Sequence, residues 1–366
     1  MQFIDLHRQY YVIEAKVNKR IQAIFKHKHF IGGEDIAELE KRLAEYVGVK
    51  HVLACASGTD ALTIPMMAYG LKKTDAVFVP SFTFFASGES VSLAGGTPVF
   101  VDSCRETFNI DPKALEETIV KTLDEGKLEP KGIIAVDLFG LPADFDEIRR
   151  IADKYNIFVL EDAAQGFGGT IRGKRACSFG DVAGTSFFPA KPLGCYGDGG
   201  AIFTDSDELY EKMKSIHVHG QGTDKYDNIQ IGLNSRLDTI QAAVLIEKLN
   251  IFDNELVNRN RVAKYYTEQL KDIVETPTVP EGYGSSWAQF TLKLKSTEER
   301  EKLNGIPAMV YYPIPMHKST AYASENDGLV LTECEKLSKT VMSLPMHPYL
   351  TDDELKTICD VVKSLY

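Results

Sequence analysis

The sequence predicts an α/β fold built on a mainly parallel central sheet. The main observation is that short apolar segments alternate with stretches of helical period, which is typical of a parallel sheet covered by helices. The second is size: 366 residues with 44% hydrophobic content can bury a large core and favour about two domains. The predicted strands cover 51–56, 76–79, 97–101, 132–136, 157–160, 182–188 and 201–204.

Helical periodicity divides the rest of the chain. Apolar residues recur at helical spacing over 34–47, and Gly48 then ends that helix. A second helix is predicted over 236–249, followed by a charged, helix-like stretch over 252–272. We place a domain boundary near residue 250, which gives a large domain over 1–250 and a smaller C-terminal α+β domain over 251–366. The smaller domain is expected to contain strands at 287–294 and 308–312 and a helix over 352–362.

Composition excludes several classes of protein. The 41 basic and 52 acidic residues give a net charge of −11, which argues against binding to nucleic acid or acidic lipid surfaces. The six cysteines lack the paired spacings of zinc or thioredoxin-like sites, so we expect no metal and reduced thiols. No apolar run approaches the roughly 18 residues of a membrane span. The cytoplasm is the expected compartment.

The segment 51–62 runs from an apolar strand through a small polar turn into a helix. Gly58 allows the backbone to approach a ligand closely, and Thr59 adds a hydroxyl near the free N–H groups at the start of the helix. These features favour an anion site. A plain helix cap is the alternative, and this segment alone favours the cap.

Two carboxylates, Glu161 and Asp162, follow directly on a predicted buried strand. Parallel sheets bind ligands at the carboxyl ends of their strands. A carboxylate there can keep a ring nitrogen protonated, as the cofactor pyridoxal phosphate requires. The alternative is that one acid caps the next helix and the other is solvated.

Lys191 lies in an apolar, glycine-rich segment between two predicted strands. Partial burial lowers the pKa of an amine and frees its lone pair for covalent chemistry. Ser186, nearby, offers another hydroxyl to a phosphate. Most lysines are solvated surface charges, but this setting argues against that alternative.

Together these segments resemble the DegT/StrS-type family of sugar aminotransferases, which have the aspartate aminotransferase (fold type I) architecture. The likeness covers essentially the whole chain. Besides the segments above, it includes 3–6, 32–47, 80–84, 234–238, 312–315 and 343–348.

The resemblance implies a pyridoxal phosphate cofactor and a role for each matched residue. Lys191 matches the lysine that binds the cofactor covalently and moves a proton, and Asp162 matches the partner of the pyridine nitrogen. Gln165 matches the residue beside the phenolic oxygen, and Phe84 matches the aromatic that stacks on the ring, with a core aromatic as the alternative. The phosphate-binding group would comprise Gly58, Thr59 and Ser186.

Asn234 and Arg236 match a family loop that reaches the neighbouring subunit's site, which implies a homodimer with shared active sites. A local interpretation is also open. Ser235 and Asp238 could form a variant capping box that opens the helix at Arg236, leaving Asn234 exposed.

The resemblance implies amino transfer from L-glutamate to C3 of a UDP-linked 2-acetamido-2-deoxy-3-keto sugar, with the glucuronate form favoured, for bacterial surface polysaccharide or lipopolysaccharide biosynthesis. Neutral UDP-3-keto-GlcNAc and a dTDP-keto-6-deoxyhexose are alternative substrates. A sugar dehydratase branch of the family has histidine in place of the lysine, so Lys191 argues against a lyase. A regulator would dispense with Lys191 and Asp162, and a plain nucleotide-binding module would need a Walker or dinucleotide glycine motif, which is absent.

One departure from the family bears on the substrate. Relatives usually have His-Tyr-Pro where this chain has Tyr311, Tyr312 and Pro313, so a potential cation near the sugar is lost. That loss raises the neutral sugar as an alternative. His317, Lys318 and Arg236 could still supply positive charge, although a solvated loop is the alternative for His317 and Lys318.

Overall fold

A seven-stranded sheet forms the centre of the computed structural model, which describes residues 1–224, 226–303 and 305–366. Its strand order is β1-β9-β8-β5-β4-β2-β3. The strands β3, β2, β4, β5 and β8 are parallel to one another, and β9 is antiparallel to both β8 and β1. The predicted α/β fold with a mainly parallel sheet is therefore confirmed. The strands are β1 (His51–Cys55), β2 (Asp75–Pro80), β3 (Thr97–Val101), β4 (Glu129–Val136), β5 (Phe158–Asp162), β8 (Val182–Ser186) and β9 (Gly200–Thr204).

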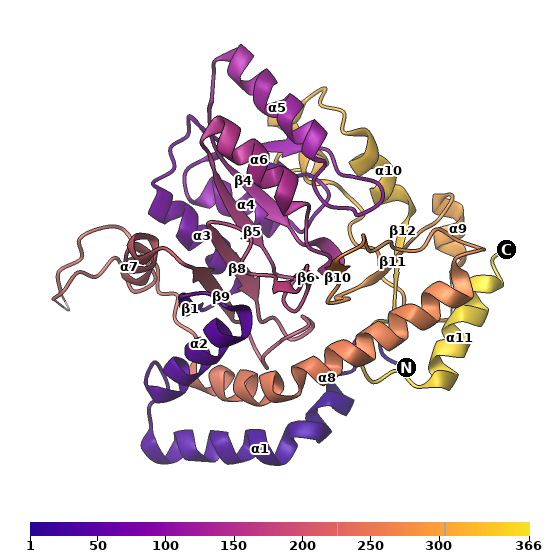
Figure 1. The fold of residues 1–366 in the computed structure, drawn as a ribbon, viewed down its shortest axis with the longest axis horizontal. Helices are drawn as coiled ribbons and strands as arrows, with labels where there is room; N and C mark the ends of the chain where they lie inside the picture. Colours follow the sequence, from indigo (N-terminus) through magenta and orange to yellow (C-terminus); the bar gives the residue numbers. More distant parts are fainter. Residues whose placement is uncertain (225, 304) are drawn as a thin grey trace.

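Helices cover both faces of this sheet (Figure 1). Ile133 and Val159 pack in a cluster with the helices α5 and α6, whereas the next residues, Ile134 and Leu160, pack in a cluster with α3 and α4. Burial on both faces explains why these strands are continuously apolar. The helices of this part of the chain are α2 (Glu34–Val47), α3 (Gly58–Tyr69), α4 (Ala86–Leu93), α5 (Pro112–Glu125), the short 3-10 helix η1 (Leu138–Gly140), α6 (Phe145–Tyr155) and α7 (Asp207–Ile216).

The helix α8 (Thr239–Leu270) runs from the sheet to the C-terminal part of the molecule (Figure 1). The two helices predicted over 236–249 and 252–272 are thus one continuous helix. It begins at Thr239 rather than Arg236, because Asp238 has the extended backbone of an N-cap residue. Because α8 is continuous through residue 250, the chain itself shows no break there. The domain boundary near residue 250 remains a prediction.

The C-terminal part is built around two antiparallel strands, β11 (Phe290–Lys293) and β12 (Val341–Leu344). The prediction of a strand over 308–312 is wrong. Within this segment only Met309 pairs, as an isolated bridge to Ser343. The chain then turns towards the large sheet, where the Met316 N–H donates to the Ser81 carbonyl. The remaining elements are the strands β6 (Thr170–Ile171), β7 (Lys174–Arg175) and β10 (Tyr283–Gly284), and the helices α9 (Thr297–Lys302), η2 (Met316–Lys318), η3 (Ala323–Asn326), α10 (Thr332–Thr340) and α11 (Asp352–Lys363).

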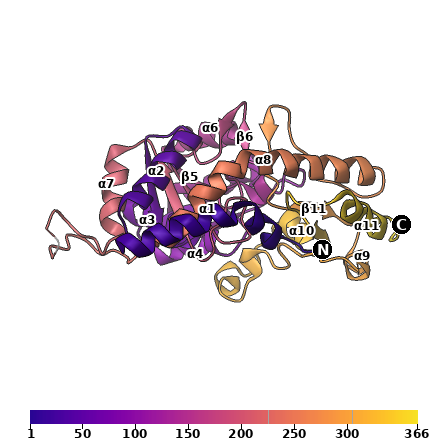
Figure 2. The same ribbon diagram turned by 90° about the horizontal axis from the view of Figure 1, so that it is seen from below.

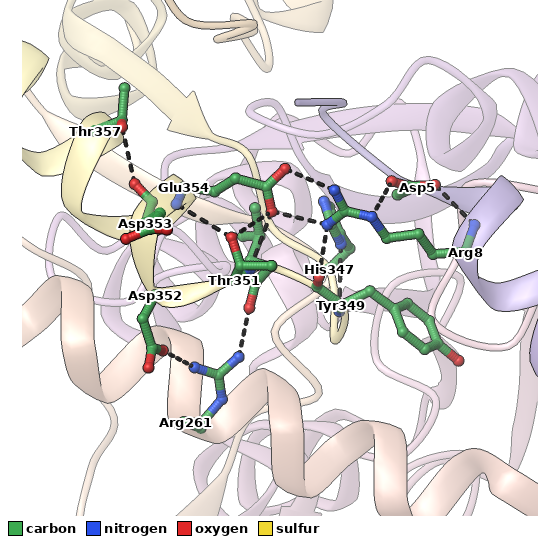
Figure 3. Close-up of polar contacts among 11 residues, drawn as sticks. Asp5, Arg8, Arg261, His347, Tyr349, Thr351, Asp352, Asp353, Glu354 and Thr357 are labelled. Atoms are coloured by element: carbon green, nitrogen blue, oxygen red, sulfur yellow. Dashed lines mark hydrogen bonds and ion pairs between the residues drawn. The ribbon is translucent and has the colours of Figure 1, made fainter.

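An unpredicted helix, α1 (Leu6–His27), lies along α8 (Figure 2). Its start is fastened to the C-terminal part, because Arg8 donates to both carboxylate oxygens of Glu354 at 2.8 Å and its backbone N–H donates to Asp5 (Figure 3). All six cysteines are free thiols. Among the residues that the structure describes, no helix combines the length and apolarity needed to span a bilayer.

Candidate active site

A pocket of about 650 Å³ lies at the carboxyl ends of the parallel strands, where such sheets bind ligands. Nine of the twelve residues predicted for the site line it, and three, Asn234, Arg236 and His317, do not. The nine are Gly58, Thr59, Phe84, Asp162, Gln165, Ser186, Lys191, Tyr311 and Tyr312.

The first turn of α3 forms one end of the pocket. Ser57 is the N-cap, and its hydroxyl accepts the Asp60 N–H at 3.1 Å, so the helix-cap interpretation is correct. The same turn also places Gly58 and Thr59 at the pocket wall. A Cβ at Gly58 would lie 2.6 Å from the Cβ of Ser186, so only glycine fits there. The unpaired N–H groups and positive dipole end of a helix suit a phosphate.

Asp162 is a buried carboxylate at the end of β5. It accepts a hydrogen bond from the Ser87 hydroxyl at 2.7 Å and one from the Ala164 N–H at 3.2 Å. Burial raises its pKa, and Ser87, Ala164 and the charge of Lys191 act in the opposite direction. A fixed carboxylate in this setting suits a protonated ring nitrogen.

Glu161 faces away from the pocket. Its carboxylate is fully buried and accepts the backbone N–H groups of Cys177 at 2.5 Å and Phe179 at 2.8 Å. The interpretation in which one acid caps a helix and the other is solvated is therefore wrong. Both carboxylates are buried, because strand geometry directs consecutive side chains to opposite faces of a sheet covered on both sides.

Lys191 lies in the loop between β8 and β9 and is partly buried. Its backbone N–H donates to the Phe188 carbonyl at 2.9 Å, which closes a turn. Burial lowers the pKa of its amine, and the Asp162 carboxylate opposes that shift. The direction of the shift is the one expected from the apolar sequence around Lys191, and it favours a nucleophilic amine.

Aromatic rings form a further wall. Phe84 is 57% exposed although it follows a buried strand, so the interpretation as a core aromatic is wrong. Its ring is open to a flat ligand. Tyr312 lies 6.1 Å from it, centroid to centroid, and accepts a hydrogen bond from the Gln165 amide at 3.0 Å. The Gln165 amide oxygen in turn accepts the Phe139 N–H at 2.6 Å, so Gln165 is held from both ends.

Asn234 and Arg236 lie outside the pocket, in the segment between α7 and α8, part of which extends away from the body of the molecule (Figure 1). Both are exposed, and the Arg236 guanidinium donates to the Asn234 amide oxygen at 2.7 Å. The capping-box interpretation is wrong, because the Ser235 hydroxyl donates to Asp60 at 2.7 Å and accepts the Ala56 N–H. Ser235 therefore fastens this segment to α3.

His317 is fully buried, so it is neither a pocket group nor part of a solvated loop. Its Nδ1 lies 2.7 Å from the Ser81 hydroxyl and its Nε2 lies 3.2 Å from a Glu335 carboxylate oxygen. Burial lowers its pKa, which favours the neutral ring. His317 therefore joins the η2 turn to the end of β2 and to α10, and presents no charge to the pocket.

Four polar residues of the pocket, Ser57, Thr83, Asp198 and Gln289, were not predicted as site residues from sequence. Asp198 is exposed at the wall, and Gln289 lies just before β11 with an amide oxygen that is buried and has no partner among the described residues. Asp198 belongs to the glycine-rich segment that contains Lys191, so its position in the sequence could have indicated a place in the pocket. Gln289 had no such signal, because only the folded chain brings the C-terminal part to the sheet.

Comparison with known proteins agrees with this geometry. Residues 12–363 match the DegT/DnrJ/EryC1/StrS aminotransferase family. The chain belongs to this family. The DegT/StrS chain is 46% identical, over 98% of both sequences, to a UDP-2-acetamido-2-deoxy-3-oxo-D-glucuronate aminotransferase of Pseudomonas aeruginosa.

Solved structures of the family show the same fold. A DegT/DnrJ/EryC1/StrS aminotransferase from Brucella abortus superimposes with a TM-score of 0.96 at 47% identity, over 100% of this chain and 99% of that one. The NtdA protein of Bacillus subtilis, solved with bound cofactor PMP, gives a TM-score of 0.87 at 33% identity, over 96% of this chain and 81% of that one. This DegT/StrS chain is therefore a pyridoxal-phosphate-dependent aminotransferase, and the helix turn, open aromatic ring, buried carboxylate and amine of its pocket fit that cofactor.

Proposed function

We propose that this aminotransferase transfers the amino group of L-glutamate to C3 of a UDP-linked 2-acetamido-2-deoxy-3-keto sugar, with the glucuronate form as the favoured substrate. The observation that carries the reaction type is that Lys191 and Asp162 line one pocket. The sugar is supported by the full-length likeness to the Pseudomonas enzyme. The product would serve bacterial surface polysaccharide or lipopolysaccharide biosynthesis in the cytoplasm, a compartment that six free cysteines fit.

We assign a separate role to each of the main residues of the pocket. When bound, pyridoxal phosphate supplies the electron sink for amino transfer. We assign Lys191 to bind it covalently and to carry the proton between the amino acid's α carbon and C4′ of the cofactor. Asp162 keeps the ring nitrogen protonated, and Ser87 holds Asp162 in place. Phe84 stacks on the ring.

The remaining assignments concern orientation of the cofactor. Gly58, Thr59 and Ser186 bind the phosphate at the start of α3, and Gln165 binds near the phenolic oxygen. Lys191 is the single cation among the described residues that line the pocket, so once it holds the cofactor, one chain offers no charged partner for a sugar carboxylate. Tyr311 lines the pocket at the position where the family resemblance implies a histidine.

A homodimer would supply the missing charge. We infer that Asn234 and Arg236 reach the neighbouring subunit's site, Asn234 towards the phosphate and Arg236 towards the substrate. Both side chains are exposed and neither lines the pocket of its own chain, which supports this arrangement. A twofold axis lets one loop complete two sites at once.

The test is a side-by-side assay with L-glutamate and two acceptors, UDP-2-acetamido-3-keto-glucuronate and neutral UDP-3-keto-GlcNAc. We expect ping-pong kinetics, with 2-oxoglutarate released before the sugar is aminated, and a higher kcat/KM for the glucuronate. NMR of the product should place the new amine at C3. Amination at C4, or a preference for the neutral sugar, would contradict the proposed substrate, and dehydration without amination would indicate a lyase.

A further inference from the structure

Lys248 is a buried cation without an ionic partner. It lies on α8 and is 1% exposed, and its Nζ has no hydrogen-bond partner among the described residues. The Nζ lies 4.2 Å from the centroid of the Tyr196 ring. Burying an unpaired ammonium group is costly, and the face of an aromatic ring within about 6 Å is one of the few features that offset that cost. The Tyr196 ring is therefore one of the groups that stabilise this charge.

Tyr196 belongs to the loop that carries Lys191, which we define as residues 187–197. The side chain of Gln241, also on α8, accepts the Tyr196 N–H at 2.9 Å and donates to the Tyr196 carbonyl at 3.4 Å. A Cβ at Gly197 would lie 2.8 Å from the Gln241 amide nitrogen, so glycine is needed for this approach. Gln241 and Lys248 are seven residues apart and share one face of the helix. The helix α8 thus holds Tyr196 by its backbone and by its ring.

Backbone hydrogen bonds within the loop 187–197 also join its two ends. The Cys195 N–H donates to the Phe187 carbonyl at 2.7 Å, and the Lys191 N–H donates to the Phe188 carbonyl at 2.9 Å. These hydrogen bonds restrict the backbone between Lys191 and Tyr196. A change at Tyr196 is expected to reach the backbone of Lys191.

We propose that Lys248 is a positioning residue whose charge, placed over the Tyr196 ring, fixes the loop that carries Lys191. The proposal rests on the function assigned to Lys191 above. Two other groups act on the charge of Lys248, Glu255 on α8 and the thiol of Cys195, and Tyr10 of α1 packs edge-on against Tyr196. Burial lowers the pKa of Lys248 to about 8, so the amine is mostly charged at neutral pH.

A second buried lysine provides a matched control. Lys293 has a side chain that is 1% exposed, and its Nζ lies 4.7 Å from the Phe108 ring centroid and pairs with Glu275. It lies outside the pocket. Lys293→Met therefore removes a buried lysine beside an aromatic ring without touching the loop 187–197.

The experiment measures hydrogen exchange of the loop 187–197 in the cofactor-free protein and the Kd for pyridoxal phosphate. We expect Lys248→Met and Tyr196→Leu each to raise exchange and Kd by about ten- to thirty-fold, as loss of a desolvated cation–π contact implies. Tyr196→Phe keeps the ring, so it should stay within about three-fold of wild type. Lys293→Met should lower Tm and leave the loop's exchange unchanged.

Equal exchange in the loop for wild type and Lys248→Met would overturn the proposal, as would an equal rise for Lys293→Met, because a purely structural role predicts a general loss of stability. If Lys248→Met does not fold, the comparison of Tyr196→Leu with Tyr196→Phe makes the same test. Exchange in the cofactor-free protein does not depend on the chemistry of Lys191. A wrong assignment of Lys191 would therefore appear in cofactor labelling and not in these measurements.

Discussion

Glu161 and Asp162 are consecutive residues of β5 with opposite surroundings. Asp162 lines the pocket and is held by the Ser87 hydroxyl, whereas Glu161 is buried beneath the loop at 177–180 and accepts three of its backbone N–H groups. Two adjacent carboxylates of similar chemistry therefore have separable effects. One is presented to the cofactor and the other holds a loop.

The first prediction uses this difference. Asp162→Asn should lower kcat by at least about a thousand-fold, because support of a developing charge in such sites is worth several kcal/mol. Its effect on the Kd for pyridoxal phosphate should be much smaller, since the phosphate is bound elsewhere. Glu161→Gln should instead lower Tm and have only a small effect on kcat. Steady-state kinetics and thermal unfolding of both variants check this, and a near-normal kcat for Asp162→Asn would contradict the assignment.

The second prediction concerns the contact between Gly58 and Ser186. A methyl group at residue 58 would lie 2.6 Å from the Ser186 Cβ, so Gly58→Ala must displace one of the two phosphate-binding elements. Overpacking of this kind costs about 1–3 kcal/mol, which corresponds to a Kd for pyridoxal phosphate weaker by about five- to 150-fold. Adding Ser186→Gly should recover part of the loss of stability. Fluorescence titration and Tm test both, and unchanged binding by Gly58→Ala would exclude the steric argument.

The third prediction is a pH dependence of stability caused by His347, which is buried beside Arg259, Asp5 and Arg8 (Figure 3 shows its surroundings). Burial lowers its pKa to about 4, below the value of about 6.5 in the unfolded chain. The unfolded state then binds the proton first, so stability is complete above pH 6.5 and is lost as the pH falls towards 4.

Between pH 7 and pH 5 the free energy of unfolding should fall by about 2 kcal/mol more in wild type than in His347→Asn, a variant whose amide oxygen can still accept the Tyr349 N–H. Urea denaturation at both pH values measures the difference. Glu354, whose pKa is lowered to about 2, contributes only at lower pH. Parallel pH profiles for the two proteins would show that the pKa of His347 is not lowered in the folded state, and would contradict this prediction.

The fourth prediction tests the shared site of the proposed homodimer. Lys191→Ala and the double variant Asn234→Ala with Arg236→Ala should each be inactive, and should complement when mixed and refolded. About half the dimers would be hybrids with one intact site each, so about a quarter of wild-type activity should return. Mass spectrometry confirms the hybrid. An inactive hybrid of stably folded parents would mean that each chain uses its own loop.

The fold was largely predictable from sequence, because a sheet buried on both faces leaves continuous apolar runs such as 132–136 and 157–160. The helix α1 was not predicted, although its buried apolar residues, Ile13, Val17 and Ile24, fall at helical spacing within a charged sequence. The segment 308–312 has the composition of a strand. It does not form a strand because, in the folded chain, only Met309 reaches the edge of the small sheet, where it pairs with Ser343.

The pocket followed the same pattern. Residues at the carboxyl ends of strands, such as Asp162 and Ser186, could be identified because these ends lie at one edge of a parallel sheet. His317 could not be placed, because its burial depends on Ser81 and Glu335, which are distant in sequence. Gln289 reaches the pocket from the C-terminal part, and no local pattern marks such a residue.

The most direct test of the central claim is to reduce the purified, cofactor-loaded protein with sodium borohydride and map its peptides. A phosphopyridoxyl label should appear on Lys191, because this residue lines the same pocket as Asp162 and the pKa of its amine is lowered by burial. Lys191→Ala should take up no label and show no turnover. A label on any other lysine, or turnover by Lys191→Ala, would contradict the assignment of this residue.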